Sequence, residues 1–145
     1  MARVEAKEVA ILGVGLGLLA LGLALALRKP PLTKGPGATF GAKISFRHRG
    51  GPQRLWVGFG LAPEGKFIGK VRIGPPIVDF SYTPFEVGSD EEWEPYEVDH
   101  KRVLPALPSG KYDVWAFLQE EGGELRPDAT GFILGRWYPA ILTIT

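Results

Sequence analysis

The chain has 145 residues, a formal net charge of +1 with the two signs interspersed, and no cysteine. This charge pattern provides no basic face for nucleic acid, and the lack of cysteine excludes disulfides, thiolate nucleophiles and cysteine-ligated zinc. Thirteen prolines and twenty glycines are typical of a chain of short strands and tight turns. Asparagine is absent and glutamine is scarce, which is compatible with a hot habitat.

After a short N-terminal tail, residues 1–8, comes a long apolar segment, residues 9–27, which reads VAILGVGLGLLALGLALAL. These nineteen residues carry no charged or hydrogen-bonding side chain. As a helix they would measure about 28 Å, close to the roughly 30 Å hydrocarbon thickness of a bilayer. We therefore expect a single transmembrane helix that anchors the chain in a lipid membrane. A buried helix of a soluble protein is the alternative, but the remaining chain is too short and strand-like to surround it.

The apolar segment has two other interpretations. Gly15 to Ala20 matches a GxGxxA dinucleotide fingerprint, but no acidic residue lies about 20 positions further on and no βαβ unit follows, so we reject it. A cleavable signal peptide, which would remove residues 1–26, stays open because Ala24-Leu25-Ala26 resembles a cleavage site. The apolar run is longer than usual for such a peptide, and Glu5 and Glu8 precede it, so an uncleaved anchor is favoured.

Small residues recur along the apolar segment at spacings of four, three and four: Gly13, Gly17, Ala20 and Ala24. On a helix they would share one face, where they would let two helices pack closely, so association with other copies or with other structural proteins is plausible. Glycine and alanine are common in spanning helices in any case, and the two explanations have equal weight. Basic residues on the C-terminal side of the segment slightly favour an inner location for the large domain.

A proline- and glycine-rich linker, residues 28–37, cannot continue the helix, and the main domain is expected over residues 38–145. Phe40, Ala42, Ile44 and Phe46 alternate with polar or small residues, which is the period of a half-buried strand. Further strands are expected at 55–61, 67–73, 77–85, 96–104, 111–119 and in two runs within 130–145. The predicted fold class is all-β, an antiparallel immunoglobulin-like β-sandwich of seven or eight strands, preceded by the single N-terminal hydrophobic helix.

The stretch LPSGKYDVW, residues 107–115, places a tyrosine two residues after a glycine, where a turn leads into a strand. Leu107, Gly110 and Tyr112 thereby match the tyrosine corner, in which the ring packs into the core and the hydroxyl bonds back to the preceding backbone. In this corner and in strand rhythm the domain resembles immunoglobulin-like and fibronectin type III sandwiches. Because the chain lacks cysteine, the closer resemblance is to the members without a disulfide.

Three aromatic residues are expected on the outer surface of one sheet. If Leu55 and Val57 face the core, Trp56 faces away; if Tyr112 and Val114 face the core, Trp115 and Phe117 face away. In an immunoglobulin topology the strand that carries Trp56 and the strand that carries Trp115 and Phe117 would be the third and the sixth, which are neighbours in one sheet. The three aromatic residues would then form a patch that contacts a protein or a sugar. A covering loop or terminal segment, or an inward Trp56, would remove this patch.

The sequence contains no catalytic constellation. His48 and His100 have no predicted partner, and no serine lies in a nucleophile elbow. The acidic stretch Ser89 to Glu92 lacks the alternating oxygen spacing of a calcium loop and is better interpreted as a solvated turn. We therefore expect no enzyme activity, no cofactor and no metal.

The stretches ATFGAKISFRHRGG, LWVGFGLAPEG and LPSGKYDVWAFLQ resemble segments of small sandwich domains in structural proteins of phages and related viruses, notably from hot environments. This resemblance implies a minor virion protein, anchored by residues 9–27 in a viral membrane or cell envelope, whose sandwich makes protein–protein contacts. One alternative is a surface-anchored module that binds carbohydrate through Trp56, Trp115 and Phe117. Another is a pilin-like filament subunit, since pilins also join an apolar helix to a β-domain.

Overall fold

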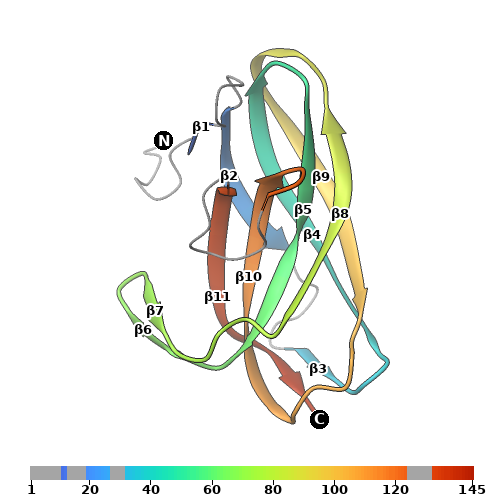
Figure 1. Ribbon diagram of the computed structural model, residues 1–145, viewed down its shortest axis with the longest axis vertical. Helices are drawn as coiled ribbons and strands as arrows, with labels where there is room; N and C mark the ends of the chain where they lie inside the picture. Colours follow the sequence, from blue (N-terminus) through green and yellow to red (C-terminus); the bar gives the residue numbers. More distant parts are fainter. Residues whose placement is uncertain (1–10, 13–18, 27–31, 124–131) are drawn as a thin grey trace.

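The computed structural model describes residues 11–12, 19–26, 32–123 and 132–145. These residues form an all-β structure of two larger sheets and a small hairpin, an arrangement compatible with a β-sandwich (Figure 1). The first sheet has the strand order β1-β2-β4-β9, with all neighbours antiparallel. Its strands are β1 (Ile11–Leu12), β2 (Leu19–Ala26), β4 (Thr39–Gly50) and β9 (Asp90–Val103).

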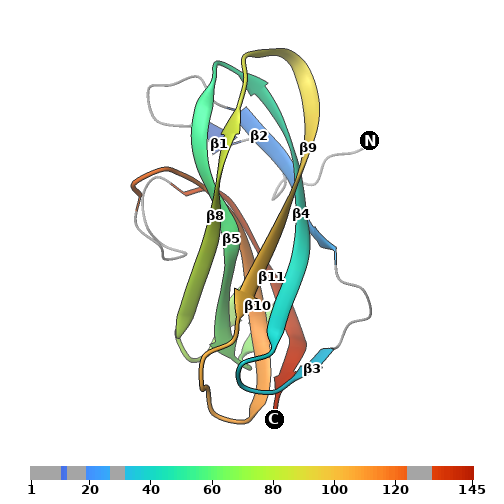
Figure 2. The same cartoon turned by 90° about the vertical axis from the view of Figure 1, so that its right-hand side faces the viewer.

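The second sheet has the strand order β3-β11-β10-β5-β8. Its strands are β3 (Leu32–Lys34), β11 (Phe132–Ile144), β10 (Gly110–Glu120), β5 (Gln53–Pro63) and β8 (Asp79–Val87). The short strand β3 runs parallel to β11, whereas the other neighbours are antiparallel. The chain therefore passes from one of these two sheets to the other after β2, β3, β4, β8 and β9 (Figure 2).

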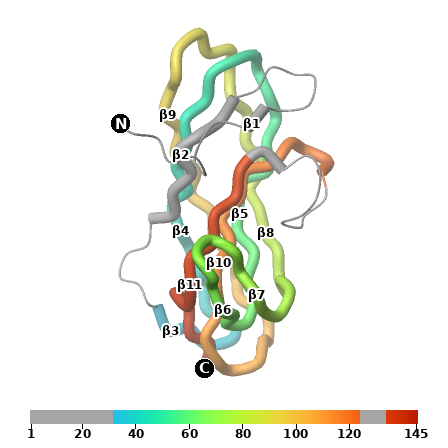
Figure 3. Tube along the Cα trace, turned by 90° about the vertical axis from the view of Figure 1, so that its left-hand side faces the viewer, coloured from blue at the N-terminus to red at the C-terminus, as the bar shows by residue number. Residues whose placement is uncertain are grey.

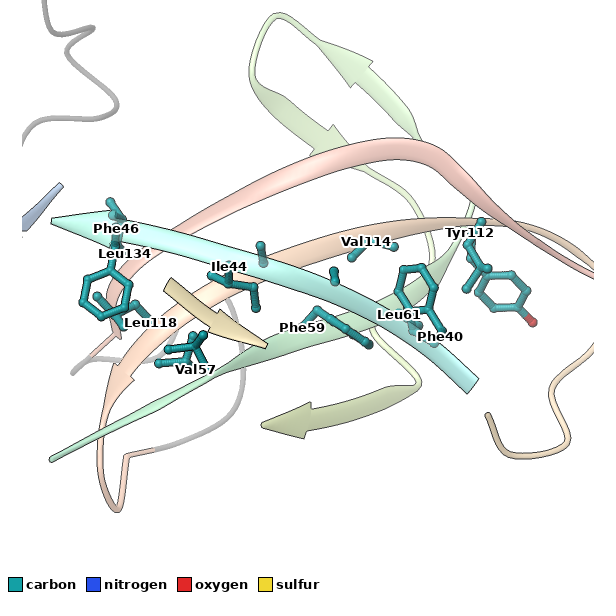
Figure 4. Packing of buried hydrophobic residues seen from close by; sticks show 14 of the residues in the cluster. Phe40, Ile44, Phe46, Val57, Phe59, Leu61, Tyr112, Val114, Leu118 and Leu134 are labelled. Atoms are coloured by element: carbon teal, nitrogen blue, oxygen red, sulfur yellow. The ribbon is translucent and has the colours of Figure 1, made fainter. Parts of the chain in front are cut away.

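The hydrophobic core lies between the two sheets, because alternate residues of the facing strands are buried. In β4 these are Phe40, Ala42, Ile44 and Phe46, which confirms the alternation expected from the sequence. The facing strands β5, β10 and β11 contribute further side chains to the same cluster (Figure 4): Leu55, Val57, Phe59, Leu61, Tyr112, Val114, Ala116, Leu118, Leu134, Leu142 and Ile144.

The segment expected as one strand over 67–73 is instead a hairpin of two short strands, β6 (Lys66–Ile68) and β7 (Val71–Ile73). Gly69 and Lys70 form the turn, and Gly69 has a φ of 61°, in the left-handed region that glycine enters without strain. The hairpin stands out from the second sheet beside β10 and β11 (Figure 3). Strand β9 begins at Asp90, so the acidic stretch expected to be a turn is partly strand.

The apolar N-terminal segment differs from expectation where it is described. Leu19–Ala26 is strand β2, paired with β4, although a helix was expected over residues 9–27. The sequence LALGLALA places leucine at every second position and alanine or glycine between, so it satisfies the period of a strand as well as an all-apolar helix. Apart from Ile11–Leu12, the rest of the expected helix lies outside the described residues and stays a prediction. Within the described ranges the chain contains no helix that could traverse a bilayer.

Candidate functional site

Tyr112 lies at the start of β10, and its hydroxyl donates a hydrogen bond to the backbone oxygen of Pro108 at 2.6 Å. The ring is buried in the core, and burial raises the pKa of the phenol. Gly110 has a φ of 145°, which a residue with a side chain rarely adopts, and Leu107 packs against the core. The three residues named for the corner therefore lie together around one turn.

The outer face of the second sheet, which points away from the core, carries a layer of stacked aromatic rings. We call it the outer aromatic layer; it consists of Trp56, Phe80, Tyr82, Trp115, Phe117 and Trp137. Trp56 stacks on Tyr82 with ring centroids 4.3 Å apart, and Trp115 stacks on Phe117 at 5.2 Å. Trp137 and Phe80 continue the layer on either side, at 6.2 Å from Trp115 and 6.1 Å from Phe117. Such offset and edge contacts are the favourable geometries for aromatic pairs.

The three residues expected to form an exposed patch lie on this outer face, but most of their surface is covered. Trp115 is 5% exposed and Phe117 is 0% exposed, whereas Trp56 is half-buried with its ring stacked on Tyr82. Trp115 lies directly over Gly135, where any side chain would overlap the indole. The rings of Trp115 and Phe117 are therefore not open to a sugar in this structure.

Asp113 is completely buried and connects β10 with β11 and with the β6–β7 hairpin. One carboxylate oxygen accepts hydrogen bonds from Arg72 Nε at 2.8 Å and from the backbone of Gly65 at 2.9 Å. The other accepts a bond from the backbone of Ala140 at 2.7 Å, where β11 bulges and the Ala140 φ is 48°. The carboxylate thus satisfies backbone groups that the sheet ladder leaves unpaired.

Arg72 projects from β7 onto this carboxylate and is itself 7% exposed on its side chain. Its other guanidinium nitrogens donate to the backbone oxygens of Pro63 and Pro75, at 2.5 and 2.7 Å. Its guanidinium carbon lies 4.4 Å from the ring centroid of Trp137. The β6–β7 hairpin is therefore held to the second sheet by a buried ion pair, hydrogen bonds and a cation–π contact.

The opposite face of this hairpin is exposed and apolar. Ile68, Val71 and Ile73 are 68%, 63% and 55% exposed. Sequence reasoning identified neither this surface nor the network of Asp113 and Arg72. One signal was present: Asp113 is a lone carboxylate within the apolar run YDVWAFL, and a charged residue there requires a buried partner.

The two histidines bind other strands rather than facing a cleft. His100 on β9 lies between hydroxyls of β8, with Ser81 at 2.7 Å from Nε2 and Thr83 at 2.9 Å from Nδ1. Burial, together with the nearby charge of Arg102, lowers the pKa of His100 to about 4, so the ring is neutral at pH 7.

His48 is completely buried, and its Nδ1 lies 2.7 Å from a carboxylate oxygen of Asp90. Tyr96 donates its hydroxyl to the same oxygen at 2.7 Å. These hydrogen bonds, first from His48 and then from Tyr96, lower the pKa of Asp90. His48 Nε2 is buried with no partner among the described residues, as are both polar atoms of the Gln119 side chain.

Two members of the expected helix-packing stripe, Gly13 and Gly17, lie outside the described residues. The other two, Ala20 and Ala24, lie on β2, where their backbone pairs with β4. The described part of the chain contains no cluster of three or more histidine, aspartate or glutamate residues arranged to hold a metal ion.

Two open surface depressions lie at one end of the sandwich. One is lined by residues 89–92 and 94–96, and another by Pro52, Gln53, Arg54, Glu86, Val87 and Glu121. Neither contains the outer aromatic layer or the exposed face of the hairpin. The chain matches no protein-family model and no curated protein.

Proposed function

We propose that the chain is a non-enzymatic structural protein, consisting of an immunoglobulin-like sandwich that is associated with a membrane through its apolar N-terminal segment. The strand order supports the immunoglobulin-like assignment. In the second sheet β11-β10-β5-β8 corresponds to the order G-F-C-C′, and in the first sheet β2-β4-β9 corresponds to A-B-E. The hydrogen bond from Tyr112 to Pro108 then lies at the start of strand F, where such domains place their tyrosine corner.

The observation that carries a structural role is the use of the buried polar side chains. Asp113 holds the hairpin to β10 and β11, His100 bonds β9 to β8, and His48 bonds β4 to Asp90 on β9. Each of these groups joins two strands within the fold, whereas a catalytic group must be open to substrate. Buried polar side chains that join strands of the sandwich suit a structural protein whose role is to make contacts with other proteins.

The membrane association rests on the nineteen apolar residues 9–27, which are long enough to span a bilayer as a helix. Such a helix requires Leu19–Ala26 to leave β4, since these residues cannot lie in the strand and in the membrane at once. The composition, without asparagine, suits a hot habitat, and the proposed setting is a minor structural protein of a virus particle or cell envelope.

Alkaline carbonate extraction of membranes that contain the full chain tests this function. We expect the protein to stay in the membrane pellet, because an apolar anchor is held by the hydrocarbon core and not by charge. Purified virus particles or envelopes should contain the chain by mass spectrometry and release it only with detergent. Complete release by carbonate would contradict the anchor, and turnover of a substrate by the purified chain would contradict the structural role.

A further inference from the structure

The β6–β7 hairpin is amphipathic, but its apolar face points away from the protein. Phe67 pairs with Arg72 on the face that meets the second sheet, where Arg72 binds Asp113. Because neighbouring residues of a strand alternate, Ile68, Val71 and Ile73 lie on the opposite face, and each is more than half exposed. A solvated hairpin face ordinarily carries polar side chains, so three β-branched aliphatic ones mark a contact surface.

The charges around this face have one sign. Between Glu64 and Asp79 the sequence GKFIGKVRIGPPIV contains three cations and no acidic residue, although the whole chain has sixteen acidic residues. Lys66 and Lys70 are exposed at the base and the turn of the hairpin, and Arg72, which binds Asp113, lies between the hairpin and the second sheet. The apolar face is therefore bordered by positive charge, which favours an anionic partner.

The bonds that attach the hairpin to the second sheet keep its apolar face turned toward solvent. The bonds from Arg72 to Asp113, Pro63 and Pro75 fix β7, and the bond from Gly65 to Asp113 fixes the start of the hairpin. The hairpin therefore cannot fold back to bury Ile68 and Val71 without breaking a buried ion pair. Figure 1 shows it projecting beyond the edge of the sandwich.

We infer that this hairpin contacts the surface of an anionic lipid bilayer, with Ile68, Val71 and Ile73 entering the interface and Lys66 and Lys70 lying among the headgroups. The inference rests on the proposed function for the nearness of a membrane. Three side chains with these exposures offer on the order of 300 Å² of apolar surface. A stable protein interface needs about 800 Å² from each partner, whereas an interfacial membrane contact combines a small apolar area with attraction to anionic lipid.

The absence of cysteine allows one site at a time to be labelled. In the full chain, Ile68→Cys carrying an environment-sensitive fluorophore reports on the hairpin, and Val103→Cys on β9 is the matched control, since Val103 is 60% exposed and Ile68 is 68% exposed. With phosphatidylcholine vesicles that contain phosphatidylglycerol, we expect a blue shift and brightening at position 68 and none at position 103. Vesicles of phosphatidylcholine alone should give a smaller change.

Substitutions then measure the contributions of charge and of apolar surface. Each of Lys66→Gln and Lys70→Gln should reduce the affinity of the hairpin for anionic vesicles about fivefold, measured by the fluorescence change at position 68. A basic residue near an anionic surface contributes a factor of that size to the affinity. Ile68→Ser combined with Val71→Ser should reduce insertion by at least about tenfold, measured with the fluorophore moved to Ile73→Cys. The control pair Lys101→Gln and Val103→Ser, also exposed on β9, should leave insertion unchanged.

The outcomes separate the hairpin contact from the membrane anchor. A chain that resists carbonate extraction while the fluorophore at position 68 stays in water would overturn the hairpin contact and leave the anchor intact. A fluorescence change without vesicles that grows with protein concentration would overturn the lipid assignment in favour of a second copy of the chain. Insertion at position 68 in a chain that carbonate releases completely would support the hairpin and overturn the anchor.

Discussion

Removal of the Tyr112 hydroxyl tests how much the tyrosine corner contributes to the stability of the fold. Tyr112→Phe keeps the buried ring but removes the hydrogen bond to Pro108, and we expect a loss of about 1–2 kcal/mol in the free energy of unfolding. Urea unfolding followed by tryptophan fluorescence measures this loss. Tyr82→Phe is the control, because the Tyr82 hydroxyl has no hydrogen-bond partner among the described residues. Equal stability of the two variants would contradict a stabilising corner.

His100 makes the stability depend on pH. Burial holds its folded-state pKa at about 4, against 6.5 when unfolded, so between these values the unfolded chain binds more protons than the folded one. The contribution of His100 is therefore complete above pH 6.5, declines as the pH falls, and is lost near pH 4, by at most about 3 kcal/mol.

The variant His100→Asn isolates this effect, because it retains hydrogen-bonding groups for Ser81 and Thr83 but does not titrate in this range. Chemical unfolding at a series of pH values should show a smaller decline between pH 6.5 and 4 for the variant than for the parent chain. Parallel curves for the two proteins would show that His100 is not the group responsible.

At the scale of elements, the Asp113–Arg72 ion pair attaches the hairpin to the sheet. Removing either partner leaves the other charge buried, so Asp113→Leu and Arg72→Met should each lower the free energy of unfolding by about 3–5 kcal/mol. The double variant should be more stable than the sum of the two losses predicts, because no unpaired charge remains. A double-mutant cycle from urea unfolding measures this coupling, and strictly additive losses would contradict the pairing.

Local patterns explain which elements could be predicted. The alternation in Phe40 to Phe46 identifies β4 because one face of the strand is buried along its whole length. The glycine before Tyr112 identifies the corner because both lie within one turn. The pairing of β5 with β10 could also be predicted, because alternation identifies both strands and a common sandwich topology makes them neighbours.

The remaining features depend on contacts between distant residues, which single-strand periodicity does not contain. Arg72 and Asp113 are 41 positions apart, and only the folded hairpin brings them together. Trp115 and Phe117 lie on the outer face of the second sheet, where their burial depends on neighbours in β8 and β11, such as Phe80 and Trp137. For Leu19–Ala26, alternating leucine and small residues satisfy both a strand and a membrane helix, and pairing with the edge of β4 selects the strand here.

At the scale of the whole molecule, a disulfide between β2 and β4 can fix residues 19–26 as a strand and so prevent them from forming a membrane helix. Leu21 and Arg47 are Cα partners in the β2–β4 ladder, within the range that a disulfide spans. In Leu21→Cys/Arg47→Cys we expect the bond to form readily without lipid. Leu21→Cys/Lys43→Cys is the control, because Lys43 lies four residues further along β4, about 13 Å away.

The locked chain then separates the two states of the apolar segment. Because the disulfide holds β2 on β4, residues 19–26 cannot enter a bilayer, so carbonate should release the oxidised double variant from membranes and leave its reduced form in the pellet. The measurement is the fraction of protein in the pellet, with and without reductant, for the locked and control pairs. If the oxidised chain also stays in the pellet, the membrane attachment does not use residues 19–26, and β2 is a permanent strand of the first sheet.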